Sequence, residues 1–452
     1  MTLQLPAPAP TTRRANSGVL ILETFLRMGC GFAVSVLLAH ELGPEGLGLI
    51  TTANSAVAIA MGFSALGLSG VLIRELVENV ERRGQVMLTV TLAKFVAGGV
   101  LLAALLVALR SLDDRPELQT LTLVIGLGFL MSSLDSVECL YNASEEFVRL
   151  VVLRLIALGA STAIKVFAIT QGWSLVFVAA GYALDYALLY VLPTVDLLCR
   201  REGGVRSGGV RLGIDTRALG RLLRRSWPVF VSGGFAQVNL KIDTLMIAGL
   251  ASIADVGIYA AASRLSEAWS LLAMAIVASS FPVLVRLKRM DTAAYARELS
   301  QLLRRLIWVS LAGAVVISIL AGHIIRLLYG PSFAAAGQVL AIHVFAGVFL
   351  FLRTAVSRWL ILEDLLMFSL VSHIAGALVN VTLNLVLIPR MGIQGAAWAS
   401  LASYAMSGFL FLLLSRRSRP MFSLIAWSAL PAKYSVQPVE RLGARMAEAR
   451  ST

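Results

Sequence analysis

Long apolar runs that contain few charges dominate this sequence and limit what the chain can fold into. Residues 18–39 and 302–320 are two examples, and similar runs follow one another along most of the chain. A helix needs about 20 mostly apolar residues to cross a bilayer, so each run has the length of a membrane span. Hydrophobic residues make up 58% of the chain and charged residues 14%, against about 25% charged residues in soluble proteins. The sequence therefore predicts an all-α polytopic membrane protein.

The length rule predicts about twelve transmembrane helices in this chain. The runs are 18–39, 47–70, 85–109, 117–140, 148–170, 173–198, 226–250, 256–285, 302–320, 334–351, 365–388 and 394–414. The run 421–430 is too short to span a membrane, and we expect it to lie on the membrane surface.

The basic residues are unevenly distributed among the connecting loops. Arginines and lysines gather in alternate loops, chiefly 200–225, 286–305 and 416–419, while the other loops carry acids such as Glu41 and Asp255. Cytoplasmic loops carry the excess of basic residues, so the pattern predicts an even number of spans with both ends in the cytoplasm. It also explains the net charge of +13 without nucleic acid as a partner.

The basic loop divides the chain into two halves that resemble each other weakly. The sequence predicts an N-terminal tail (1–17), a six-helix lobe (18–199), a basic cytoplasmic linker (200–225), a second six-helix lobe (226–416) and a basic C-terminal tail (417–452). Both halves would begin on the same side of the membrane. A parallel repeat of this kind is typical of transporters that bind their substrate between the halves.

Several ionisable residues lie well inside the apolar runs. A charge at the centre of a spanning helix costs about 2.5–3.5 kcal/mol on insertion scales, so such residues usually face a cavity or a partner. Glu23 and Arg27 are four residues apart and can pair on one helix face. Arg264 and Glu267 are three apart and can pair in the same way.

The remaining deep charges have no partner nearby in the sequence. Lys241 and Asp243 are two residues apart and point in different directions, and Lys94 has no local partner. Arg154 lies near the end of its span, where it is expected to extend toward the membrane surface. The deep bases Arg27, Lys94, Lys241 and Arg264 either bind a substrate in a cavity or pair between helices. The acids Glu23, Asp243 and Glu267 are then counter-charges or a site of proton coupling.

Neutral polar residues form a stripe on the span 365–388. His373, Asn380 and Asn384 share one face of this helix. The stripe either lines a cavity or forms hydrogen bonds between helices. His323 and His343 are isolated, and neither has metal-ligand spacing with another His, Cys or acid, so no metal site is expected.

Catalytic motifs are missing from the sequence. It contains no GxxxxGK[ST] phosphate loop, no HExxH motif and no visible Ser-His-Asp arrangement. No loop is long enough to form a catalytic domain. We therefore expect a transporter and not an enzyme, with no cofactor and with proton or sodium coupling as the open options.

Five segments together resemble a known family. They are LGPEGLG at 42–48, NLKIDTLMI at 239–247, VGIYAAASRLSE at 256–267, the Phe-Pro pair at 281–282 and NVTLNLVLIPRMGIQGAA at 380–397. In them the chain resembles the polysaccharide-biosynthesis flippases of the multidrug/oligosaccharidyl-lipid/polysaccharide superfamily. The resemblance covers about residues 17–416 and is diffuse.

The resemblance implies a V-shaped, MATE-like bundle of two six-helix lobes that works by alternating access. Its substrate would be an undecaprenyl-diphosphate-linked oligosaccharide, moved across the bacterial inner membrane for O-antigen, capsule or exopolysaccharide synthesis. A polysaccharide polymerase and chain-length machinery are the implied protein partners. Deep bases can hold a diphosphate through charge-assisted hydrogen bonds, which makes Arg27, Lys241 and Arg264, then Lys94, the expected ligands.

Other functions stay open at this point. A multidrug or cation antiporter of the same fold binds organic cations, although the unpaired bases here favour an anion. A peptidoglycan-precursor flippase is a second alternative, and a membrane-embedded polysaccharide polymerase a more distant one. In a scaffold protein without transport activity, the deep charges would only hold the helices together.

Overall fold

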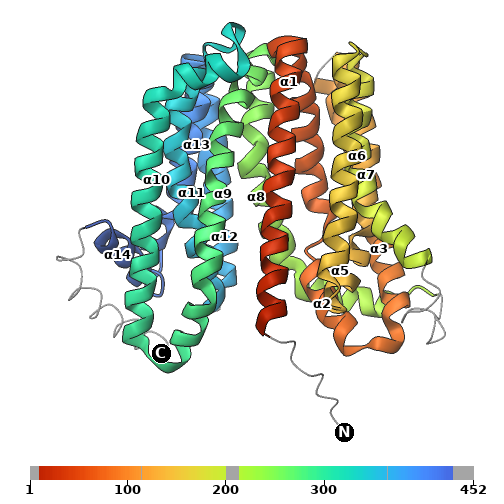
Figure 1. Ribbon diagram of the computed structural model, residues 1–452, viewed down its shortest axis with the longest axis vertical. Helices are drawn as coiled ribbons and strands as arrows, with labels where there is room; N and C mark the ends of the chain where they lie inside the picture. The colour runs from red at the N-terminus through yellow and green to blue at the C-terminus, as the bar shows by residue number, and fades with distance from the viewer. Residues whose placement is uncertain (1–9, 113–114, 200–212, 364, 431–452) are drawn as a thin grey trace. The chain divides into compact units, whose positions relative to one another are not determined.

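The computed structural model describes residues 10–112, 115–199, 213–363 and 365–430, and every regular element in these ranges is a helix (Figure 1). The prediction of an all-α chain is therefore confirmed. The contacts divide the chain into two compact units. The first lobe consists of Met1–Glu41 and Ala56–Val231, and the second lobe of Leu42–Ser55 and Ser232–Thr452. The predicted tails and linker lie partly outside the described residues, so the domain boundaries stay a prediction.

The first helix passes from one lobe to the other and back. α1 (Pro10–Ser64) contains Gly43 with φ 66° and ψ −168°, followed by Pro44. Glycine adopts positive φ without a steric penalty, and proline has no N–H to donate, so the helix is interrupted here. Two helical stretches therefore meet at Gly43, and Leu42–Ser55 belongs to the second lobe.

Helices packed side by side form the first lobe. After α1 come α2 (Ser69–Glu78), η1 (Val80–Arg82), α3 (Arg83–Leu112), α4 (Pro116–Leu130), η2 (Met131–Leu134), α5 (Asp135–Ala143), α6 (Phe147–Thr170), α7 (Leu175–Cys199) and the start of α8 (Thr216–Leu250). α7 packs against both α4 and α6, and α2 packs against α5. Leu68, Leu72, Val90, Leu140 and Leu150 lie in the core where α2 meets α5.

One predicted span of this lobe is interrupted. The run 117–140 is not a continuous helix, because α4 ends at Leu130 and a 3₁₀ turn precedes α5. Asp135 and Glu138 then lie in the first turn of α5, where the helix dipole favours negative side chains. The apolar pattern had hidden this break.

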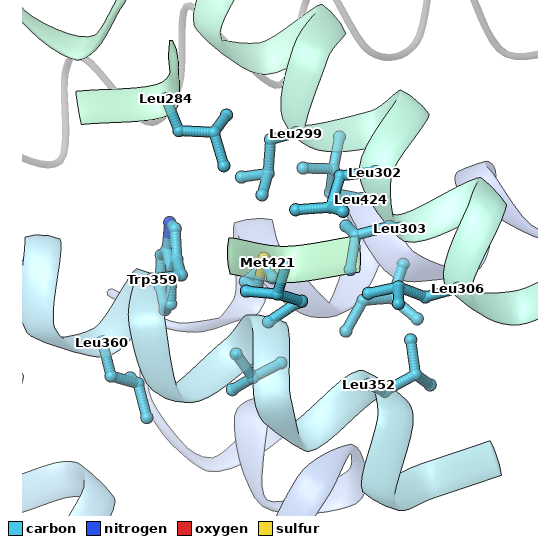
Figure 2. Close-up of a cluster of buried hydrophobic side chains, with 14 of the residues drawn as sticks. Leu284, Leu299, Leu302, Leu303, Leu306, Leu352, Trp359, Leu360, Met421 and Leu424 are labelled. Carbon is cyan, nitrogen blue, oxygen red and sulfur yellow. The ribbon is translucent and has the colours of Figure 1, made fainter. Parts of the chain in front are cut away.

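The second lobe is built around α11. It contains the end of α8, α9 (Ile253–Met290), α10 (Thr292–Tyr329), η3 (Pro331–Phe333), α11 (Ala336–Leu362), α12 (Leu366–Met391), α13 (Ile393–Gly408), η4 (Leu410–Leu414) and α14 (Arg419–Ser428). α11 packs against α9, α10 and α13. Figure 2 shows the apolar core of this lobe, in which Leu303, Leu352, Trp359 and Leu424 converge. Through Met421 and Leu424, α14 closes the core, while Trp427 stays exposed.

Ten helical stretches in the described part of the chain are long and apolar enough to cross a membrane. One of them, Leu22–Ser64, has 43 residues and contains the Gly43 kink, so its length matches two spans. α8 is not among the ten, and it contains Lys241 and Asp243 well inside its length. The multi-pass architecture is confirmed, whereas the count of twelve helices stays a prediction.

A pair of glycines brings two backbones together in the second lobe. A Cβ on Gly48 would lie 1.9 Å from the carbonyl oxygen of Ile253, and a Cβ on Gly257 would lie 1.9 Å from that of Pro44. Backbone atoms cannot rotate away as a side chain can. Small residues allow membrane helices to approach this closely, and this contact holds Leu42–Ser55 on α9.

A buried arginine donates a hydrogen bond to a carbonyl group at the C-terminal end of α13. Arg353 of α11 is 8% exposed; its Nη1 donates to the carbonyl oxygen of Ser407 at 2.7 Å and to Oγ of Ser372 at 2.9 Å, and its Nη2 donates to Oγ of Ser369 at 3.3 Å. Ser407 lies in the last turn of α13. A cation is stabilised at a helix C-terminus because the last carbonyl groups carry partial negative charge.

We predict that Gly257→Ala destabilises the second lobe by about 1–3 kcal/mol, because the added methyl group forces two backbones apart. Thermal unfolding of the purified protein in detergent measures the effect. The matched control is Gly249→Ala in α8, where a Cβ meets no atom within 4 Å. Equal stability of the two variants would contradict the close contact.

We also predict that Arg353→Lys lowers the thermal stability of the protein, because an ammonium group lacks the planar fork that reaches two helices at once. The expected loss is about 1–3 kcal/mol, as for a charged group left incompletely hydrogen-bonded. Arg358→Lys, at an exposed site on the same helix, serves as the control. A stability like that of the unmodified protein would show that the α13 cap is dispensable.

Candidate functional site

A polar cavity of about 180 Å³ lies within the second lobe. Its walls come from the Leu42–Ser55 segment of α1 and from α8, α9, α11 and α13. The lining includes Thr51, Asn54, Lys241, Asp243, Tyr259, Arg264, Glu267, His343 and Tyr404. The structure therefore brings together four of the residues predicted from the sequence, Lys241, Asp243, Arg264 and Glu267.

The two bases of the cavity are held differently. Lys241 Nζ lies 3.5 Å from Glu267 Oε1, and both side chains are about one quarter exposed. Arg264 Nη2 donates a long hydrogen bond of 3.4 Å to Oγ1 of Thr51. Among the described residues, no carboxylate lies within ion-pair distance of Arg264. Its positive charge is therefore available to an anion in the cavity.

The expected pairing of Arg264 with Glu267 is wrong. Glu267 pairs with Lys241 of the neighbouring α8 instead. A spacing of three residues permits contact on one helix face, but it does not exclude a better-placed base on the next helix. Spacing along the chain does not show which cation pairs with the Glu267 carboxylate.

Asp243 is the most enclosed charge of the cavity. It is 4% exposed and accepts hydrogen bonds from Nδ2 of Asn384 at 2.6 Å, from the hydroxyl of Tyr259 at 3.0 Å and from Oγ of Ser400 at 2.5 Å. All three donors are neutral. Among the described residues, no base lies within ion-pair distance of this carboxylate, so its charge is held by hydrogen bonds alone.

The predicted polar stripe of α12 supports this carboxylate. Asn384 donates to Asp243 and also to Oδ1 of Asn380 at 2.7 Å, which confirms that the two asparagines share a face. Both are buried and neither lines the cavity. Their contacts agree with the second interpretation of the stripe, hydrogen bonding between helices. His373 is partly buried and also lies outside the cavity lining.

A stripe of serines on α13 completes the polar framework. Ser400 donates to Asp243, and Ser403 donates to Oδ1 of Asn239 at 2.5 Å. Together with Ser407 at the Arg353 cap, these residues recur at the spacing of one helix face. The spacing of three and four residues is a signal of this stripe that is present in the sequence itself.

The deep charges of the first lobe form a separate network. The predicted Glu23–Arg27 pair is confirmed at 3.0 Å, and Arg27 Nη1 lies 3.9 Å from Asp185 Oδ1. Lys94, 3% exposed, binds both carboxylate oxygens of Asp135 at 2.8 Å. Each of these bases therefore has a carboxylate from the same lobe.

Arg154 and Lys165 extend this network. Arg154 Nη2 lies 2.6 Å from Glu138 Oε2, so the expectation that Arg154 extends to the membrane surface is wrong. Lys165 Nζ lies 3.1 Å from Asp185 Oδ2. Each of these two bases therefore has an opposite charge on a neighbouring helix. The bases of the first lobe are thus neutralised locally, in contrast to Arg264.

Two further residues, His343 of α11 and Tyr404 of α13, line the cavity. His343 is isolated in the sequence, and Tyr404 belongs to none of the predicted motifs. His343 packs edge-to-face on Tyr259, with the ring centroids 5.8 Å apart. Only the packing of α11 against α9 and α13 brings these aromatic side chains to the charged residues.

Comparison with proteins of known sequence gives two family matches. Residues 14–288 match the polysaccharide biosynthesis protein family, and residues 189–439 match the lipid II flippase MurJ family. A curated relative, the probable flippase AglR of Haloferax volcanii, is 31% identical over 217 residues, which is 46% of this chain. The match spans only 41% of that relative's length.

Solved structures agree in fold. The lipid II flippase MurJ in an inward closed conformation aligns with a TM-score of 0.67 and 15% identity over 96% of this chain and 98% of that one. An inward-facing multidrug resistance MATE family transporter of the MOP superfamily gives 0.66 and 14%, over 89% and 96% of the two chains. A MOP superfamily transporter from Pyrococcus furiosus gives 0.60 and 15%, over 91% and 96%.

The MATE-like fold is thus confirmed, and the family match extends over more than half of the chain. The sequence segments, the helical lobes and these comparisons agree with one another. The chain belongs to the polysaccharide biosynthesis protein family.

Proposed function

We propose that this protein is a flippase that moves a lipid-linked oligosaccharide across a membrane by alternating access. The observation that carries the proposal is Arg264, a base in a polar cavity of the second lobe with no carboxylate partner among the described residues. A guanidinium group presents donors in a fork that suits phosphate oxygens. The relatives described as flippases support the same activity.

This cavity suits the phosphate-bearing headgroup of the substrate. A diphosphate between lipid and sugar carries negative charge whichever glycan is attached. Arg264 would bind it directly, and Lys241 would join by exchanging its 3.5 Å contact with Glu267 for a phosphate oxygen. Glu267 then serves as the counter-charge that keeps Lys241 in place while the cavity is empty.

The other predicted cations have a different role in this proposal. Arg27 and Lys94 already bind carboxylates within the first lobe. Removing an ionic partner from a buried charge is costly, so exchange for a phosphate is less favourable there than at Arg264. We assign Arg27, with its counter-charge Glu23, and Lys94 to the packing of the first-lobe helices.

Asp243 is the proposed coupling site. Of the acids considered from the sequence, Glu23 and Glu267 each have a basic partner, whereas Asp243 has only neutral donors. A carboxylate that is not neutralised by a base can take up a proton or a sodium ion. Uptake at Asp243 would couple transport to an ion gradient.

The glycan is the open part of the proposal. An undecaprenyl-diphosphate-linked oligosaccharide for O-antigen, capsule or exopolysaccharide synthesis is the first candidate, supported by the family match. The match of residues 189–439 to the lipid II flippase family favours a peptidoglycan precursor as the second. Both candidates carry a polyprenyl diphosphate, so the cavity serves either.

The cellular setting follows from the distribution of charge. The basic loops predict that both ends lie in the cytoplasm. We propose the bacterial inner membrane as the location, with the substrate loaded from the cytoplasmic leaflet. A polysaccharide polymerase and its chain-length machinery would then take the product on the other side.

We predict that Arg264→Ala reduces export of surface polysaccharide at least about tenfold, the effect of losing roughly 1.4 kcal/mol of binding in the transported state. Lipid-linked glycan should accumulate in the cytoplasmic leaflet. Arg264→Lys should retain part of the activity, and Arg305→Ala, at an exposed site on α10, should retain all of it. Normal export by an abundant Arg264→Ala protein would refute the cavity assignment. Accumulation of lipid II instead of a lipid-linked oligosaccharide would select the second candidate.

For Asp243→Asn we predict a folded protein whose transport no longer responds to a proton or sodium gradient. The amide keeps the size of the carboxylate and loses its charge. The measurement is flipping of a fluorescent lipid diphosphate in proteoliposomes with either gradient imposed. Glu267→Gln is the comparison and should keep the gradient response. An Asp243→Asn protein with the response intact would place the coupling site elsewhere.

A further inference from the structure

His343 is a buried histidine of the cavity with one ring nitrogen that has no hydrogen-bond partner among the described residues. It lies on α11, is 5% exposed and faces the same space as Lys241 and Glu267. Its Nδ1 is enclosed and has no hydrogen-bond partner among the described residues. A buried polar atom without a hydrogen-bond partner costs about 1–3 kcal/mol. A bound ligand or a proton on this nitrogen would reduce that cost.

The surroundings of the imidazole are charged on two sides. α8 contributes Lys241 and Asp243, α9 contributes Tyr259, Arg264 and Glu267, and α13 contributes Tyr404. The Leu42–Ser55 segment lines the cavity with Thr51, Asn54 and Ser55. α10 also packs against α11, and its residues 306–322 include no charged or titratable side chain. The titratable residues of α12 are His373 and Arg390. Asp243, Glu267 and Lys241 line the same cavity as the imidazole.

The fixed charges of the empty cavity cancel. Lys241 and Arg264 contribute two positive charges, and Asp243 and Glu267 contribute two negative ones. A bound diphosphate therefore leaves an excess of negative charge in a poorly solvated space. Such an excess favours the charged form of a nearby base, and histidine is the side chain that ordinarily changes charge between about pH 5 and 8.

We propose that His343 takes up a proton when the anionic headgroup enters the cavity, and that this imidazolium is part of the substrate-binding site. The inference rests on the proposed function and adds a residue and a linkage to it. The proton comes from water and forms an N–H bond on the ring nitrogen that carries the free electron pair. The imidazolium offers a new donor to the phosphate or to Glu267, and a bond to Glu267 releases Lys241 toward the phosphate.

Linkage fixes the direction of the pH effect. A ligand that promotes protonation binds more tightly where the proton is already available, because the coupling is reciprocal. Binding of the headgroup should therefore strengthen as the pH falls, by up to about tenfold per pH unit for one proton taken up. Release is favoured where the cavity opens to a less acidic solution.

Farnesyl diphosphate binding to the purified full-length protein in detergent tests the proposal at pH 6, 7 and 8. The variants are His343→Gln and His343→Asn, and the control is His323→Gln, an exposed histidine on α10. The diphosphate of the probe also titrates in this pH range. Its contribution to the pH dependence is the same for every variant and cancels when the variants are compared. Between pH 8 and pH 6, the affinity of the unmodified protein should rise at least about tenfold more than that of either His343 variant. The His323→Gln protein should behave like the unmodified one.

Calorimetry of the unmodified protein gives a readout that needs no variant. In buffers of different ionisation enthalpy, binding should take up protons beyond those that the probe itself accounts for. The same pH dependence in the His343 variants, or no extra proton uptake, would overturn the proposal and leave the anion cavity standing. Failure of the unmodified protein to bind the probe at any of these pH values would overturn the proposed anion site as well.

Discussion

A charge inside a bilayer must be compensated within the protein, and this requirement organises both lobes. Water cannot solvate a deep side chain, so each charge needs an opposite charge, a set of aligned dipoles or a ligand. The first lobe meets the requirement with ion pairs, for example Lys94 with Asp135 and Arg154 with Glu138. The second lobe meets it less completely, and its cavity lies where the compensation is incomplete. The candidate site thus combines one ion pair, Lys241 with Glu267, with two charges, Arg264 and Asp243, that have no ionic partner among the described residues.

The polar residues around the cavity form a rigid frame for these charges. Asn384, Ser400 and Tyr259 each come from a different helix and converge on Asp243. Hydrogen bonds of this kind hold membrane helices together where there is little hydrophobic difference between lipid and protein. Because Asp243 accepts hydrogen bonds from α9, α12 and α13, a change in its charge would alter the contacts of all three helices. In the proposed coupling mechanism, a proton or sodium ion taken up at Asp243 would therefore alter the packing of the lobe directly.

The sequence predicted what depends on local spacing and missed what depends on tertiary packing. The Glu23–Arg27 pair and the shared face of Asn380 and Asn384 follow from helical periodicity, and both are present. The pairing of Glu267 with Lys241 joins two helices and had no signal in the spacing. The interruption after Leu130 was hidden because a 3₁₀ turn made of apolar and small residues keeps the hydropathy of a span. His343 is isolated in the sequence because its charged neighbours in the cavity come from other helices.

Arg264 and Arg353 show why a missing counter-ion is not by itself evidence of a site. Neither has a carboxylate within ion-pair distance among the described residues, yet their surroundings differ. Arg353 is enclosed, and its terminal nitrogens donate to two serine hydroxyls and to a carbonyl at the end of α13, where the helix dipole supplies negative potential. Arg264 borders a cavity, and its one hydrogen bond is long. Arg353 thus uses its terminal nitrogens to hold helices of the lobe together, whereas Arg264 faces a cavity, where the proposed function has it bind an anion.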